Sequence, residues 1–223
     1  GSGGGIGVNG TSYGDYLYWD SNASTWTVGT TSIHLGSYAG QYSQGGSAVA
    51  IGRQTGSSSQ GQYAIAIGYQ AGLTKQGESA VGIGYYAGSI SQGTYAVAIG
   101  HIAGSQLQGD YAVAIGYWAG FMGQGANAIA IGNAAGQTNQ TPNSIVLNAS
   151  GAELNASESG FFADPIRATE TTDNIMVYDP STKEIRYTTT TISGGGIGVN
   201  GTSYGDYLYW NSTSSAWTVG SAR

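Results

Sequence analysis

A block of alternating small and aliphatic residues returns every sixteen residues through the middle of the chain. Degenerate copies at 33–36 and 145–147 keep this spacing although the letters change. A repeat this short is typical of a solenoid, in which each coil stacks only on its neighbours. The clear copies occupy 48–52, 64–68, 80–84, 96–100, 112–116 and 128–132.

The alternation inside each block has a period of two, which favours a β-strand and excludes a helix. The 40 glycines point the same way, since glycine destabilises helix interiors. Turns are expected at pairs such as Ala71-Gly72 and Gln76-Gly77, because glycine adopts the positive φ of tight corners. The sequence therefore predicts an all-β fold, a β-solenoid of 16-residue coils with about eight rungs, in which stacked glutamines form an amide ladder.

Alternation also sorts the side chains of each rung onto two faces, one mostly of alanine and one of valine and isoleucine. A flattened coil has room for a thin core only, so one face fills the coil and the other needs a partner. An apolar stripe along a rod favours coaxial self-association, and a homotrimer is the first choice. The aliphatic stripe comprises Val49, Ile51, Ile65, Ile67, Val81, Ile83, Val97, Ile99, Val113, Ile115, Ile129 and Ile131.

A second repeat operates on a larger scale, because residues 2–30 recur at 193–221 with five differences in 29 positions. In the first copy the aromatic and β-branched runs at 16–19 and 26–28 predict a β-hairpin. An isolated hairpin is marginal in water, so we expect its tryptophans to pack on the solenoid or on another chain. The repetition indicates one period of a tandem array, or a protomer whose two ends do equivalent jobs.

The sixteen-residue period is lost after Asn148, where acidic residues appear. Strands at 175–178 and 184–187 are expected to pair through a turn that has Pro180 in its second position. We interpret this segment as a connector that ends the solenoid and protects its open edge. Four parts are predicted: a hairpin module at 1–31, the β-roll at 32–148, the β connector at 149–192 and the second hairpin module at 193–223.

Composition excludes several classes of function. The net charge is −6 with only six Lys and Arg, whereas nucleic-acid binding needs clustered cations. The sequence has neither a basic amphipathic stretch nor an apolar run of roughly 18 residues, so membrane insertion is not expected. With no cysteine and only His34 and His101, little remains to bind zinc. We therefore expect no cofactor and no metal.

Motifs for catalysis are weak. Residues 5–10 match GxGxxG, but an aromatic β segment follows where a dinucleotide site needs a helix. The same glycine-rich run approaches a calcium-binding nonapeptide without its carboxylate. Glu78 and Asp110 are the only carboxylates of the repeats and lie two coils apart, which does not suit a paired acid and base. His34 stands in a column of alanines and is interpreted as a cap, and His101 as exposed to solvent. No enzyme activity is expected.

Seven Asn-X-Ser/Thr sequons are present, against roughly two expected by chance from the abundance of Ser and Thr. Four of them fall in predicted turns or connectors, where a glycan would fit. The alternative is that these asparagines form turns, in a chain that is not exposed to the enzymes of N-glycosylation. Comparing the intact mass with the sequence mass would distinguish the two. The candidate N-glycosylation sites are Asn9, Asn22, Asn139, Asn148, Asn155, Asn200 and Asn211.

The repeat AxAIGxxAGxxxQG resembles the head repeat of trimeric autotransporter adhesins, the YadA-like left-handed β-roll, over about half of the chain. This resemblance implies three parallel rolls around one axis at a cell surface. The order of segments along the whole chain is similar to that in phage and giant-virus fibre proteins. A YLYW hairpin comes first, followed by the rungs and then by segments 144–151, 160–167 and 178–187.

These observations lead to two main hypotheses about function, and a weaker third is an enzyme carried on a fibre, which loss of activity on mutating Glu78 or Asp110 would support. The first is a structural segment of an extracellular or virion-surface fibre, built from end-to-end units and acting as a rigid spacer and scaffold. The second is an adhesin or receptor-binding head, in which exposed aromatics such as Tyr69, Tyr85, Tyr117 and Trp118 contact host glycans or matrix protein.

Overall fold

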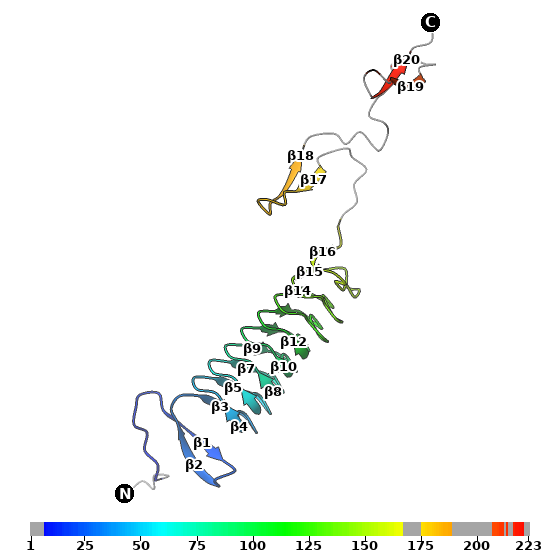
Figure 1. Cartoon of the computed structure of the whole chain (residues 1–223). Coiled ribbons are helices and arrows are strands. Elements are labelled where there is room, and N and C mark those ends of the chain that lie inside the picture. Colours follow the sequence, from blue (N-terminus) through cyan, green and yellow to red (C-terminus); the bar gives the residue numbers. More distant parts are fainter. Residues whose placement is uncertain (1–6, 167–174, 189–206, 212, 214–215, 221–223) are drawn as a thin grey trace. The chain divides into compact units, whose positions relative to one another are not determined.

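The computed structural model describes residues 7–166, 175–188, 207–211, 213 and 216–220. The chain divides into two units, 1–166 and 167–223, which are described separately (Figure 1). Every regular element among the described residues is a strand, and stacked parallel strands form a solenoid. The predicted all-β class is therefore confirmed.

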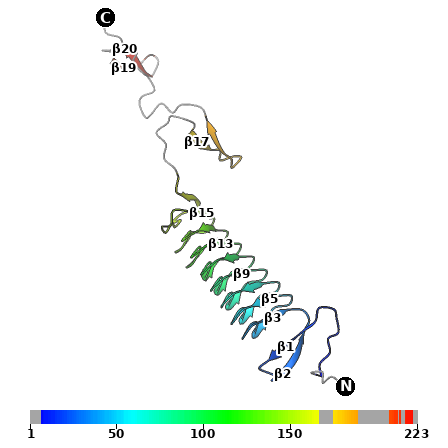
Figure 2. The same cartoon turned by 180° about the vertical axis from the view of Figure 1, so that it is seen from behind.

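The first sheet of the solenoid contains nine parallel strands (Figures 1 and 2). Paired residues are sixteen positions apart, as in Val97 with Val113, so the repeat sets the register. Nine strands bound eight turns, in agreement with the predicted number of rungs. The strands are β3 (Ile33–Leu35), β5 (Val49–Ile51), β7 (Ile65–Ile67), β9 (Val81–Ile83), β11 (Val97–Ile99), β13 (Val113–Ile115), β14 (Ile129–Gly132), β15 (Ser144–Asn148) and β16 (Gly160–Asp164).

The second sheet of the solenoid contains five strands from the other half of each coil. Parallel bridges from Gln106 to Met122 and from Met122 to Thr138 continue its pairing beyond the last strand. The coil therefore has two strand-bearing sides joined by glycine-containing corners. The strands are β4 (Tyr42–Gln44), β6 (Ser58–Gln60), β8 (Thr74–Gln76), β10 (Ile90–Gln92) and β12 (Gln106–Gln108).

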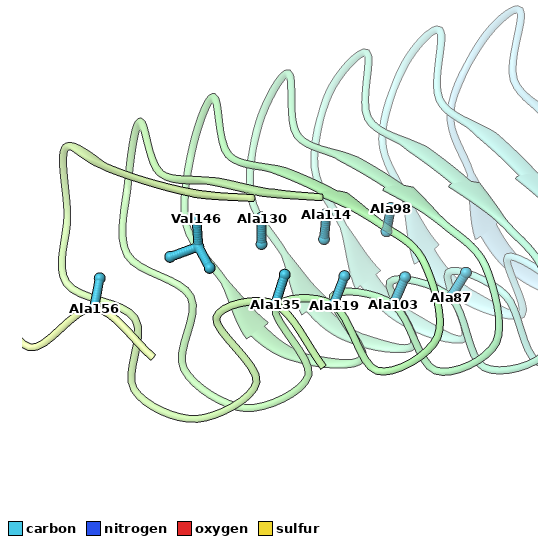
Figure 3. Packing of buried hydrophobic residues seen from close by; sticks show 9 residues of the cluster. All are labelled: Ala87, Ala98, Ala103, Ala114, Ala119, Ala130, Ala135, Val146 and Ala156. Atoms are coloured by element: carbon cyan, nitrogen blue, oxygen red, sulfur yellow. The ribbon is translucent and has the colours of Figure 1, made fainter. Parts of the chain in front are cut away.

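Alanines fill the interior of the coils. Ala98 and Ala114 of the first sheet are fully buried, as are Ala103 and Ala119, which follow the glycine corner (Figure 3). Figure 3 shows these alanines as two facing rows along the solenoid. The sequence left open which face of the strand fills the coil, and the structure assigns that role to the small face. The valine and isoleucine face is thereby turned outward.

A glutamine ladder runs through the same interior. The Nε2 group of Gln76 donates to Oε1 of Gln92 at 3.0 Å, and Nε2 of Gln92 donates to Oε1 of Gln108 at 3.1 Å. The ladder extends from Gln60 to Gln140, and Nε2 of Gln140 ends it on the Ser144 hydroxyl at 3.1 Å. The predicted amide ladder is therefore present, and it lies inside the solenoid.

The corners depend on left-handed backbone conformations. Gly104 has a φ of +53°, as predicted for the Ala-Gly pairs, and Gly100, which was not predicted as a corner, has a φ of +127°. The prediction was wrong for the Gln-Gly pairs, because Gly77 does not adopt a positive φ and the left-handed residue of that corner is Ser79, with a φ of 54°. The coil of Gly100 also places Ile102, Leu107 and Tyr111 at φ values between 57° and 60°. Such values are uncommon outside glycine and asparagine, and most of all for a β-branched residue. Nothing in these residue types signalled a corner, so sequence reasoning missed them.

The solenoid continues one strand beyond its predicted end at residue 148. Strand β16 pairs in parallel with β15, and Phe161 lies sixteen residues after its partner Ile145. The sixteen-residue period is therefore kept although the residue types change. Val146 occupies the position of an inward alanine, and Leu154 and Phe162 pack against the end of the alanine core. Larger side chains fit there because the stack of coils ends.

A hairpin covers the other end of the solenoid. Strands β1 (Tyr16–Asp20) and β2 (Thr25–Gly29) pair as predicted. The Tyr16 hydroxyl donates to the Ser32 carbonyl at 2.6 Å and accepts from the His34 backbone N–H at 2.8 Å. One phenol thus satisfies an N–H of the edge strand β3 and the carbonyl that immediately precedes this strand. The His34 ring lies 4.8 Å from that of Tyr18, consistent with its predicted capping role.

Acidification is expected to loosen this cap. Burial lowers the pKa of the half-buried His34 imidazole below its ordinary value of about 6.5, and the nearby Asp20 carboxylate opposes this only in part. The unfolded chain then binds the proton more readily, so the contribution of His34 is complete above about pH 6.5 and is lost as the pH falls below it. Hydrogen exchange of the β3 amides at about pH 7.5 and about pH 5 measures the effect.

The variant His34→Ala, which restores the residue found in later coils, should exchange equally at both pH values after correction for the intrinsic rate. The variant His101→Ala removes an exposed histidine instead and should keep the wild-type difference. Equal pH dependence in wild type and His34→Ala would show that another group is responsible.

The second unit contains two hairpins among its described residues. Strands β17 (Ile175–Tyr178) and β18 (Ile185–Thr188) pair across a turn in which Asp179 accepts from the Ser181 and Thr182 backbone N–H groups. Strands β19 (Tyr207–Asn211) and β20 (Ala216–Gly220) repeat the register of β1 and β2. Both predicted hairpins are confirmed, with β18 starting one residue later than expected. The glycine-rich run at 193–206 lies outside the described residues.

Candidate association surface and aromatic row

The aliphatic stripe lies on the outer face of the nine-stranded sheet. Nine of its twelve side chains are half-buried, and the other three are exposed, Ile99 and Ile115 at 36% each and Ile131 at 41%. None of the twelve is buried, although equivalent residues flank them in neighbouring coils. The stripe includes Leu35 of the degenerate first rung, which is 52% exposed, and continues past the predicted rungs to Phe161, which is 54% exposed. A single chain thus presents a continuous apolar surface along its solenoid.

A row of stacked rings follows one corner of the coils. Tyr69, Tyr85, His101 and Tyr117 occupy equivalent positions, and successive ring centroids lie 4.9 to 5.4 Å apart with interplanar angles of 8 to 16°. This aromatic row begins beneath the Arg53 guanidinium, which lies 5.8 Å from the Tyr69 centroid. Offset stacking of this kind contributes about 0.5–1.5 kcal/mol per pair beyond area burial. The aromatic row therefore helps to hold neighbouring coils in register.

Stacking within the aromatic row also limits which parts of its rings a ligand can contact. The rings of Tyr85 and His101 have a neighbour over each face, so a sugar ring cannot stack on them. Tyr85 and Tyr117 are 45% and 50% exposed through their remaining surface. Trp118, expected to be exposed, instead stacks between Tyr117 and Phe121, and its indole Nε1 is buried without a hydrogen-bond partner.

The tryptophans of the first hairpin are exposed in the single chain, so they are not packed into the solenoid, and their packing on another chain stays a prediction. Trp19 and Trp26 are 54% and 43% exposed and contact each other edge to face at 5.7 Å. Tyr16 and Tyr18, on the same hairpin, make the contacts to the first coil described above. An open cavity of about 520 Å³ lies between hairpin and coil, lined by residues that include Trp19 and His34. The sequence pattern identified the docking hairpin, whereas the residues that dock are its tyrosines.

The acidic and glycine-rich candidates do not assemble into a catalytic arrangement. Glu78 and Asp110 are both exposed, and the Asp110 carboxylate accepts from the Thr94 backbone N–H at 2.8 Å, one coil away. In the part of the chain that the structure describes, no three His, Cys, Asp or Glu residues gather closely enough to hold a metal. Of the GxGxxG segment, residues 7–10 are described, and a loop and strand β1 follow them.

The structure separates the candidate glycosylation sites by accessibility. Asn148 is 4% exposed and its amide donates to the backbone carbonyls of Asn133 and Ala152, which leaves no room for a glycan. The exposed residues Asn9, Asn22, Asn139 and Asn155 remain candidates, although the Asn155 side chain also bonds to Thr138 and Glu153. Asn211 is half-buried and accepts from the Thr213 N–H, and Asn200 lies outside the described residues.

Among the residues that the structure describes, none lies in a helix suited by length and apolarity to cross a bilayer. No family model, curated protein or solved structure matches this chain.

Proposed function

We propose that this chain is a rigid, non-enzymatic segment of an extracellular or virion-surface fibre, in which it serves as spacer and scaffold. The observation that carries the proposal is the exposed aliphatic stripe on the nine-stranded sheet. Soluble monomers rarely leave an apolar patch of this extent in water, and such patches mark interfaces. The straight stacking of eight turns supports a mechanical role, because each coil transmits load only to its neighbours.

Self-association through the stripe is the first part of this proposal. Each solenoid has one such face, and the stripe follows the direction in which the coils stack. Three chains that turn this face toward a common axis bury it along its whole length and form a closed assembly. The resemblance to trimeric adhesin heads favours the same number of chains.

The paired variants Ile99→Lys and Leu107→Lys test the interface. Leu107 is 64% exposed on the five-stranded sheet, so both variants place one charge on an exposed aliphatic site. We expect light scattering to show a wild-type trimer, dissociation of Ile99→Lys to monomer, and no change in Leu107→Lys. Burying an unpaired ammonium explains the difference. A wild-type chain that is monomeric at every concentration tested, with no filaments in electron micrographs, would refute the proposal of a fibre segment.

The repeated hairpin modules are proposed as joints between units. Strands β19 and β20 share the register of β1 and β2, in which Trp19 pairs with Trp26 and Trp210 with Trp217. In the first unit this hairpin covers the first coil of a solenoid. The second module supplies the same element for a further solenoid in an end-to-end array.

An adhesin or receptor-binding head is the second candidate. The specific observation in its favour is the aromatic row, whose exposed edges repeat at each coil. Since the ring faces are covered, binding would use phenol hydroxyls and ring edges in place of stacking. A glycan and matrix-protein array separates the candidates: saturable binding that is lost in Tyr117→Ala supports the adhesin, and its absence supports the spacer.

A further inference from the structure

We propose that Tyr95 and Tyr111 form an oxidative cross-linking site that joins consecutive coils through a dityrosine. The two rings are stacked with centroids 5.3 Å apart and an interplanar angle of 16°. They lie one coil apart, at 48% and 58% exposure, so an oxidant can reach both. This pair occupies a different corner from the aromatic row.

The backbone holds the two phenols in place. The N–H of Tyr95 donates to the Glu78 carbonyl and that of Tyr111 to the Thr94 carbonyl, each at 2.9 Å. Both residues have a φ of 58°, so they leave the coil in the same direction. Because the two rings already stack, rotation of the side chains brings the carbons ortho to the phenolic oxygens toward each other. Pre-organisation of this kind favours reaction within the chain over reaction between chains.

The chemistry requires a peroxidase and hydrogen peroxide. Each phenol loses one electron and one proton, and the two phenoxyl radicals form a carbon–carbon bond between positions ortho to the oxygens. The hydrogen on each joined carbon then moves to the phenolic oxygen, which restores both aromatic rings. The peroxide accepts two electrons and two protons and becomes two waters. The chain has no cysteine, so no thiol competes for the radicals.

The column that contains this pair offers matched controls. Tyr63 stands two coils before Tyr95 and is 53% exposed, but Ser79 occupies the position between them. Tyr63 is therefore an equally exposed phenol in the same column without a neighbour at the next coil. Ser79 has a φ of 54°, close to that of its tyrosine equivalents, so Ser79→Tyr should insert a ring between Tyr63 and Tyr95.

The experiment treats the full chain with a haem peroxidase and hydrogen peroxide and follows dityrosine fluorescence and peptide masses. We expect a peptide that links positions 95 and 111, with a yield that does not change on dilution, and a raised melting temperature. Tyr95→Phe keeps the ring but should lose this peptide, Tyr63→Phe should keep it, and Ser79→Tyr should add links to Tyr63 or Tyr95. An unchanged 95–111 region in treated wild type, or links only between chains, would overturn the proposal.

Discussion

Gly100→Ala is expected to break the solenoid in the middle of its stack. Gly100 has a φ of +127°, and a Cβ added there would lie 2.5 Å from the carbonyl oxygen of Gly116 in the next coil. The contact is with backbone, so side-chain rotation cannot relieve it. A non-glycine residue at such a φ costs about 1–3 kcal/mol, and overpacking adds about 1–3 kcal/mol. We expect a loss of about 2–6 kcal/mol in unfolding free energy, measured by denaturant titration.

Gly46→Ala is the control for this substitution. A Cβ at Gly46 would meet no heavy atom within 4 Å, so the same chemical change should alter stability by no more than about 0.5 kcal/mol. Because coils stack only on neighbours, Gly100→Ala should also raise hydrogen exchange most strongly in β11 and β13. Equal stabilities for the two variants would mean that the coils can move apart at the glycine column.

Periodic features were predictable because the same physical requirement repeats in every coil. Strands such as β11 and the hairpin of β1 and β2 follow from alternation and from aromatic runs, which local sequence displays directly. The inward face was not decided by hydropathy, since Ala98 and its neighbours Val97 and Ile99 are all apolar. Side-chain volume decides it: two sheets joined by short corners approach closely, so the small alanine face of each first-sheet strand fits inside the coil and the larger valine and isoleucine face does not.

Features set by tertiary contacts were harder to predict. The left-handed conformation of Ile102 is maintained by its coil neighbours, as its N–H donates to the Tyr85 carbonyl at 2.8 Å. Isoleucine itself carries no signal for that conformation. The final strand β16 had a usable signal, because Gly160 lies sixteen residues after Ser144. At this end of the solenoid the sixteen-residue spacing predicted the strand better than residue type did. The last coil accepts larger side chains than the coils in the middle of the stack.

Gln92→Leu should remove one rung of the buried glutamine ladder at nearly constant volume. Gln92 is 2% exposed, and the substitution leaves Oε1 of Gln108 without its donor and Nε2 of Gln76 without one acceptor. The carbonyl of Val81 also loses a hydrogen bond of 2.8 Å. An unsatisfied buried polar group costs about 1–3 kcal/mol, so we expect a loss of about 2–4 kcal/mol in unfolding free energy.

Two further variants separate hydrogen bonding from packing in this ladder. Gln62→Leu makes the same change at an exposed glutamine and should shift stability by no more than about 0.5 kcal/mol. Gln92→Glu keeps the shape and the acceptor for Gln76, but its carboxylate cannot donate to Gln108. Its destabilisation should therefore be greatest at neutral pH and decrease in acid, where a protonated carboxyl regains a donor. If Gln92→Leu and Gln62→Leu proved equally stable, the glutamine ladder would add no measurable stability to the backbone pairing and alanine packing that join the coils.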